Sequence, residues 1–146
     1  ILSEVELPSG DPTTILRRNA DYVFDALKDD PAFFARFSFF VYAADPEVNQ
    51  LLERGEDDVI ADFTPWVERY LQLIGRRIRA PFTTSLLLVS INSLFQGLCL
   101  RYRTSPDLVE HDGGDTDGDG STMYAKGLEA LLLHFSEPVP AAEATA

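Results

Sequence analysis

The chain has 146 residues, of which 45% are apolar and 25% are charged, a composition typical of one folded domain rather than a disordered segment. Twenty-four acidic against twelve basic residues give a formal net charge of −12. This balance argues against binding of nucleic acid or anionic lipid by this segment alone, because both need a basic surface. The single cysteine, Cys99, excludes an intrachain disulfide and favours a reducing, cytoplasmic setting.

The two ends of the chain predict short segments outside the folded domain. The first residue is Ile1 and the only methionine is Met123, so we expect a fragment or a processed product. Residues 1–10 contain two acids and no base, unlike a targeting signal, and we interpret them as a leader to a domain over residues 11–137. Residues 138–146 are rich in alanine and proline and predict a disordered tail.

Three Asp-Pro pairs mark predicted helix starts in the first third of the chain. The aspartate side chain can accept from the free amides of a first helical turn, and the proline takes a position where its missing amide costs nothing. The pairs predict helices from Pro12 to about Lys28 and from Pro31 to about Tyr42. They also predict a short helix from Pro46 to about Glu53, which stops before Gly55.

Apolar periodicity predicts the remaining helices. A helical spacing covers residues 56–79 and contains Pro65, so that either one helix bends there, which we favour, or Thr64 caps a new helix. The segments 82–103 and 121–136 predict the last two helices, with residues 105–120 as a solvated acidic loop. Strand patterns and internal repeats are absent from the sequence, which therefore predicts an all-α domain of five or six helices.

The sequence carries only weak signals for a metal site or for catalysis. Residues 115–120 match the opening of an EF-hand loop, but Lys126 stands where that loop needs a bidentate acid. The histidines, His111 and His134, lack zinc-ligand spacing, and no glycine-rich phosphate loop or local nucleophile set accompanies them. We therefore expect no metal, no cofactor and no enzymatic activity, although residues distant in sequence can still assemble a catalytic triad.

The uncharged run from Ala80 to Leu100 is long enough to span a membrane and has arginines on both sides. Its seven serine, threonine, asparagine and glutamine residues are too many for a lone helix in hydrocarbon, and the flanking arginines give no asymmetry. We interpret the run as a helix buried on two faces in a soluble assembly and expect no membrane contact.

The helix over residues 82–103 has more apolar surface than one core can use. Ser90, Ser93 and Gly97 form a strip of small side chains on it, which allows another helix to approach closely. Together with the apolar seam of the last helix, this strip predicts a four-helix bundle across the two-fold axis of a homodimer. The seam consists of Tyr124, Leu128, Leu131 and Phe135. The alternative is that both helices complete a monomeric core.

Large rings and a few amides on the other helices predict an apolar cavity with some polar groups, as small-molecule sites are built. Buried amides need hydrogen-bond partners, which a ligand or water can supply. The predicted lining residues are Phe37, Phe63, Trp66, Tyr70, Asn92 and Phe95. The alternative is that the rings pack edge to face as a filled core, which describes a helical protein-interaction module without a pocket.

Residues 94–101, LFQGLCLR, followed by Ser105-Pro106-Asp107, resemble the penultimate helix of the C-terminal domain in tetracycline-repressor-type (TetR-family) transcriptional regulators. The order and lengths of the helices over residues 11–136 are also similar, whereas Gln96 stands where many relatives carry aspartate. In that family a helix-turn-helix of roughly fifty N-terminal residues reads operator DNA in the major groove. The C-terminal domain dimerises through its last two long helices and binds a small effector.

The resemblance implies a function that composition alone does not give. It implies an effector-binding and dimerisation domain of a regulator, with a small apolar or aromatic molecule as effector. Such a domain contacts DNA only through a helix-turn-helix module, which this sequence does not contain. The acidity of the chain agrees with that division, because the basic surface would lie on the other module.

Overall fold

The structure is a computed structural model that describes residues 11–110 and 120–140. The expected leader, the EF-hand-like acids and the last six residues of the expected tail lie outside the described residues. Over the described part, most residues are helical and the only sheet has two strands, so the all-α fold class is confirmed. The elements are α1 (Pro12–Leu27), α2 (Pro31–Ser38), the 3-10 helix η2 (Phe39–Tyr42), α3 (Pro46–Leu73), β1 (Arg76–Ile78), α4 (Thr84–Tyr102), α5 (Pro106–Glu110), α6 (Met123–Phe135) and β2 (Ser136–Pro138).

The three Asp-Pro pairs begin α1, α2 and α3, as predicted. Asp11 accepts from the amide of Thr14 at 2.9 Å, and Asp30 and Asp45 accept from first-turn amides at 2.8 and 2.9 Å. The hydroxyl of Thr14 also donates to Asp11. Hydrogen bonds from the amide and then the hydroxyl of Thr14 hold the pKa of Asp11 below its usual range, because they favour the charged carboxylate.

Helix α3 is one continuous helix, so the predicted break between Glu53 and Gly55 is wrong. Gly55 lies within the helix, where the guanidinium of Arg36 occupies the space that a Cβ would need. Gly55 therefore lies inside the helix and does not mark its end. The hydroxyl of Thr64 donates to the carbonyl of Ile60 at 2.7 Å, a bond inside one helix, so Thr64 does not cap a new one.

The predicted helix over residues 56–79 ends early, at Leu73, and the expectation of no strand is wrong. Gly75 has a φ of +65°, a conformation that favours glycine and turns the chain out of the helix. β1 then pairs antiparallel with β2, with Arg77 opposite Glu137. The predicted tail begins at Pro138, which lies in β2, and the amide of Val139 donates to the carbonyl of Gly75 at 2.9 Å. The predicted loop over 105–120 begins with α5.

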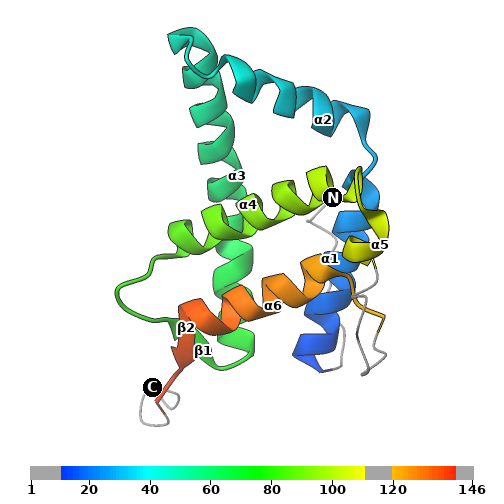
Figure 1. Ribbon diagram of the computed structural model, residues 1–146. Coiled ribbons are helices and arrows are strands. Elements are labelled where there is room, and N and C mark those ends of the chain that lie inside the picture. Colours follow the sequence, from blue (N-terminus) through cyan, green and yellow to red (C-terminus); the bar gives the residue numbers. More distant parts are fainter. Residues whose placement is uncertain (1–10, 111–119, 141–146) are drawn as a thin grey trace.

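Helices α4 and α6 lie side by side and run in opposite directions, in front of α1 and α3 in the view of Figure 1. Helix α2 and the first half of α3 project from these helices as an arm (Figure 1). The core lies where α1, α4 and α6 meet. At its centre the ring of Phe24, which is fully buried, stacks on Tyr124 at 5.9 Å and meets Phe95 edge to face at 6.0 Å.

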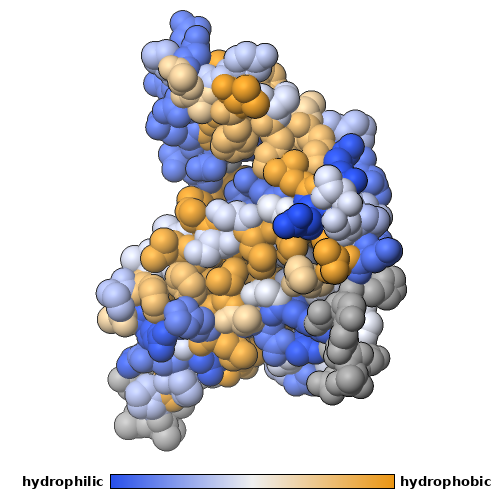
Figure 2. All heavy atoms as spheres, viewed as in Figure 1, coloured by the Kyte–Doolittle hydropathy of each residue, from blue (hydrophilic) through white to orange (hydrophobic). Residues whose placement is uncertain are grey.

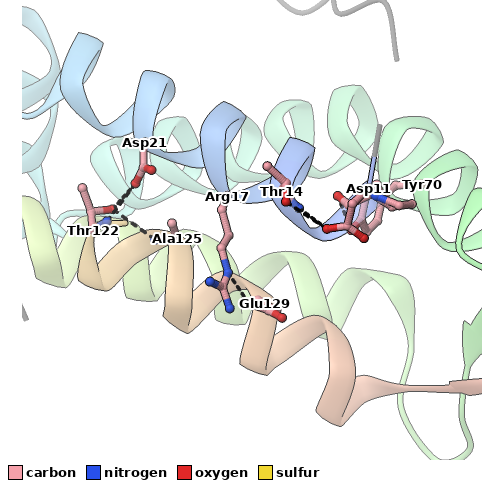
Figure 3. Close-up of polar contacts among 9 residues, drawn as sticks. Asp11, Thr14, Arg17, Asp21, Tyr70, Thr122, Ala125 and Glu129 are labelled. Atoms are coloured by element: carbon pink, nitrogen blue, oxygen red, sulfur yellow. Dashed lines mark hydrogen bonds and ion pairs between the residues drawn. The ribbon is translucent and has the colours of Figure 1, made fainter. Parts of the chain in front are cut away.

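Polar side chains fix α1 against α6, as Figure 3 shows. Asp21 accepts from the amide of Thr122 at 3.0 Å and from its hydroxyl at 2.7 Å. The Thr122 side chain in turn caps α6 by accepting from the amide of Ala125 at 3.2 Å. One turn back along α1 and two turns further along α6, Arg17 pairs with Glu129 at 2.6 Å. These contacts set the position of α6 on α1, and with it the position of Tyr124.

Candidate ligand-binding site

A cavity of about 260 Å³, here called the large cavity, lies between the arm and the body of the domain. Its wall is built by α1, α2, η2, α3 and α4, with Tyr124 of α6 at one side. Most of the lining side chains are apolar. The polar lining residues are Arg36, Glu56, Asn92, Gln96 and Tyr124.

Four of the six predicted lining residues face this large cavity. Phe37 comes from α2, Phe63 from α3, and Asn92 and Phe95 from α4. Helix α4 contributes three further lining residues on the same side, because its cavity-facing positions repeat with helical spacing. Three helices that are distant in sequence therefore converge on one apolar space.

A second space of about 100 Å³, here called the small cavity, lies among α1, α3, α4 and α6. Trp66 lines it, and Phe63 lines both cavities. Tyr70, also predicted as lining, faces neither: its ring stacks on Trp66 at 5.7 Å and its hydroxyl donates to the carbonyl of Pro12 at 3.2 Å. Burial raises the pKa of Tyr70 to about 12. Tyr70 thus supports the wall rather than forming it.

The two cavities are neighbours that share part of one wall. The shared lining residues are Val23, Phe63, Leu88, Ile91 and Tyr124. Sequence reasoning missed Val23, Leu88 and Ile91 because aliphatic residues on a helical stripe look like ordinary core. The sequence predicts Tyr124 in a dimer seam. The hydroxyl of a tyrosine among leucines needs a hydrogen-bond partner, however, and this need could have indicated a ligand site.

The amides at the large cavity have no partners within the described chain. Asn92 and Gln96 are half-buried, and no hydrogen bond between described residues involves either side chain. The guanidinium of Arg36 forms no ion pair with a described residue either. These groups are available to orient a bound molecule, as polar groups do in small-molecule sites.

The described residues offer little for metal or nucleophilic chemistry. No group of three or more metal-binding side chains occurs among them. Cys99 is fully buried, and burial raises the pKa of its thiol to about 11, so the thiol is protonated at neutral pH. His134 lies in the last turn of α6, the expected position, and its ring contacts Phe82 and Phe135.

The strip of small residues predicted on α4 is open. Ser93 and Gly97 are exposed, and a Cβ added at Gly97 would meet no atom within 4 Å. Ser90 is half-buried, and its hydroxyl donates to the carbonyl of Leu86 at 2.8 Å. Three large apolar residues flank the strip and are about half exposed: Leu86, Val89 and Leu100.

The seam predicted on α6 needs correction, because this chain already buries it. Tyr124, Leu128 and Phe135 are buried in the core, and Leu131 packs against that core. The sequence pattern identifies the most apolar stripe of the helix. In the structure, α1 and α4 of the same chain cover this stripe. The apolar residues of α6 that remain exposed on the opposite stripe are Met123, Ala130 and Leu133, and the exposed His134 lies beside them.

We call the exposed set on the two helices the α4–α6 face. It consists of Leu86, Val89, Ser93, Gly97 and Leu100 on α4 and Met123, Ala130 and Leu133 on α6. Figure 2 shows apolar atoms gathered over α4 and α6 on the side turned to the viewer. A contiguous exposed apolar surface is a candidate site of interaction.

Within the described ranges, α4 is the one helix that is long and apolar enough to cross a membrane. Of its most apolar stretch, 28% is buried inside the structure. Length and composition alone are weak evidence for a span, because the core helix of a soluble protein passes the same test.

No protein-family model, curated protein or solved structure matches this chain. The two cavities and the α4–α6 face are therefore the observations from which a function can be inferred.

Proposed function

We propose that this chain is the ligand-sensing and dimerisation domain of a TetR-type transcriptional regulator. In this proposal it binds a small apolar or aromatic effector, pairs with a second copy in the cytoplasm, and acts on DNA through a helix-turn-helix module outside this sequence. It has no catalytic role. The observation that carries the proposal is the large cavity, whose mostly apolar wall includes Phe37, Phe63 and Phe95 together with the amide of Asn92.

The size of the cavity supports a ligand site over a filled core. Its volume of about 260 Å³ exceeds the roughly 150 Å³ of an apolar cavity that holds a benzene ring. The cavity reaches from the exposed residues Arg36, Phe40 and Glu56 to the buried residues Leu88, Phe95 and Tyr124, so that a small molecule can enter it from solvent. The main alternative, a helical interaction module with a filled core, predicts no cavity of this size.

Helix α4 supplies a physical link between ligand and dimer. Asn92 and Phe95 face the large cavity, whereas Ser93 and Gly97 lie on the α4–α6 face of the same helix. A ligand that favours one position of α4 therefore favours one arrangement of the two subunits. The shift in that equilibrium is limited by the difference in ligand affinity between the two arrangements.

The α4–α6 face fits a second copy of this chain better than it fits lipid. Ser93 and Gly97 allow a helix to approach closely, and a two-fold axis would place the same strip on both partners. Amides on the other side of α4, at Asn92 and Gln96, are unfavourable in hydrocarbon. The net charge of −12 agrees with DNA contact through another module.

The test uses the single tryptophan as a reporter. Trp66 lines the small cavity beside Tyr70, so a bound molecule should change its emission. We expect saturable changes on titration with members of a panel of apolar and aromatic compounds, confirmed by calorimetry. Val59→Phe, which places a ring in the large cavity, should abolish binding there.

A matched control is Val41→Phe, because Val41 is 82% exposed in η2 and does not line the large cavity. That variant should bind as the wild type does. The proposal is wrong if no compound in the panel changes the emission or releases heat, or if Val59→Phe binds as tightly as Val41→Phe.

A further inference from the structure

Asn19 of α1 is a polar side chain without a partner at the small cavity. It lines this cavity, and its amide nitrogen is shielded from solvent while no described residue accepts a hydrogen bond from it. Its amide oxygen takes part in no hydrogen bond with the described chain either. Buried polar groups are nearly always paired, so this amide calls for a partner that the described chain does not supply.

The remainder of the small cavity wall is almost entirely apolar. Besides Asn19, the lining residues with a polar side-chain atom are Tyr22, Trp66 and Tyr124, and none of the lining side chains carries a formal charge. A carboxylate or ammonium group placed there would lose part of its hydration without gaining an opposite charge. The small cavity therefore selects for an uncharged group.

Tyr124 adds a second hydrogen-bonding group at the boundary between the two cavities. Burial raises the pKa of its hydroxyl, so the hydroxyl keeps its proton at neutral pH. No described residue forms a hydrogen bond with this hydroxyl. Asn19 and Tyr124 thus approach the small cavity from α1 and α6, which the Asp21–Thr122 contacts hold together.

Volume determines how much of a molecule each cavity can hold. The small cavity, about 100 Å³, is below the roughly 150 Å³ that accommodates a benzene ring, so it fits the end of a molecule. The large cavity, about 260 Å³, fits a ring or a longer apolar body. Because the two share Phe63, Ile91 and Tyr124, one elongated molecule can occupy both when these side chains change rotamer.

We propose that the effector is an uncharged, elongated molecule whose apolar body fills the large cavity and whose inner end carries a hydroxyl or carbonyl oxygen. A hydroxyl at that end donates to the amide oxygen of Asn19, which no described residue uses, and the Tyr124 hydroxyl donates to the oxygen in either case. This inference rests on the proposed sensor function and adds the chemical class of the effector.

The experiment compares two probes that differ in one group. Phenylbutanol carries a terminal hydroxyl, and in pentylbenzene a methyl group replaces that hydroxyl. Binding of each probe is measured by calorimetry and by Trp66 emission to the wild type, to Asn19→Leu and to Asn19→Ala. Circular dichroism confirms that the variants are folded.

We expect Asn19→Leu and Asn19→Ala to weaken binding of phenylbutanol about tenfold, the effect of one lost hydrogen bond. In Asn19→Leu, which keeps the side-chain volume, pentylbenzene should bind at least as tightly as it binds the wild type. The matched control is Gln72→Leu, which removes an exposed amide of α3 outside both cavities and should leave the affinity for each probe unchanged.

The outcomes separate this inference from the proposed function. If both probes bind the wild type, and the ratio of their two affinities is the same in the Asn19 variants, the inference is wrong and the sensor function stands. If only charged compounds in the wider panel bind, the inference is wrong as well. If no compound binds any variant, the inference and the proposed function are both wrong.

Discussion

Leu94 of α4 packs directly over Gly127 of α6, so that a Cβ added at Gly127 would lie 2.7 Å from Cδ2 of Leu94. The two helices approach closely here because α6 has no side chain at this position. Gly97 of α4 differs, because no atom lies within 4 Å of its Cβ position. One glycine thus serves packing within the chain, and the other leaves open the face that we assign to a second copy.

These two glycines predict opposite effects of substitution. Gly127→Val should push α4 from α6 and lower the free energy of unfolding by about 1–3 kcal/mol, as overpacking does. Gly97→Ala should raise it by about 1 kcal/mol, because alanine is the better helix former and meets no neighbour. Urea unfolding of both variants in a Leu133→Glu background, in which pairing is prevented, measures these effects. Equal effects of the same sign would contradict this account of α4–α6 packing.

The contacts of Asp21 with Thr122 predict a stability effect at the start of α6. Asp21→Ala leaves the amide and hydroxyl of the buried Thr122 without their acceptor, and should cost about 1–3 kcal/mol in unfolding free energy. Asp62→Ala is the matched control: Asp62 is exposed on α3 and should change stability by less than about 0.5 kcal/mol. Denaturant unfolding that gave the same loss for both variants would refute the role of Asp21.

Burial of Cys99 predicts a pH dependence at the alkaline end. Its folded pKa of about 11 lies above the usual 9.0, so the folded state holds the proton more tightly than the unfolded state. The contribution to stability is complete below pH 9.0 and is lost as the pH rises through about 11. The wild type should therefore lose more stability over this range than Cys99→Ala, in which the tyrosines still titrate. The prediction is contradicted if thermal unfolding of the wild type and of Cys99→Ala shows the same loss of stability as the pH rises.

The helix starts could be predicted from the sequence because their causes are local. Asp11, Asp30 and Asp45 each accept a hydrogen bond from an amide two or three residues ahead, and a proline follows each of them. Such signals need no knowledge of the remainder of the chain. Four lining residues of the large cavity could also be predicted, because small-molecule sites are lined by aromatic residues with a few amides, and these residues lie on helical stripes.

The elements that sequence reasoning missed depend on partners distant in the chain. Gly55 suggests a helix end although α3 continues through it, and β1 forms by pairing with β2, in which Arg76 meets Ser136, 60 residues away. Periodicity identifies the apolar stripe of α6 without showing what covers it, so it predicts a seam with a second subunit where α1 and α4 in fact lie. Asn19 gave no sequence signal, because its significance lies in the cavity that it lines.

Pairing through the α4–α6 face is the central claim, and sedimentation velocity tests it most directly. The wild type should sediment as a dimer at micromolar concentration, because the face exposes Leu133 (49% exposed) and Leu100 (50% exposed) beside Ser93 and Gly97. Leu133→Glu should sediment as a monomer, whereas Val41→Glu, on the arm, should remain dimeric. A wild type that is monomeric at these concentrations, or a Leu133→Glu variant that stays dimeric, would contradict the account.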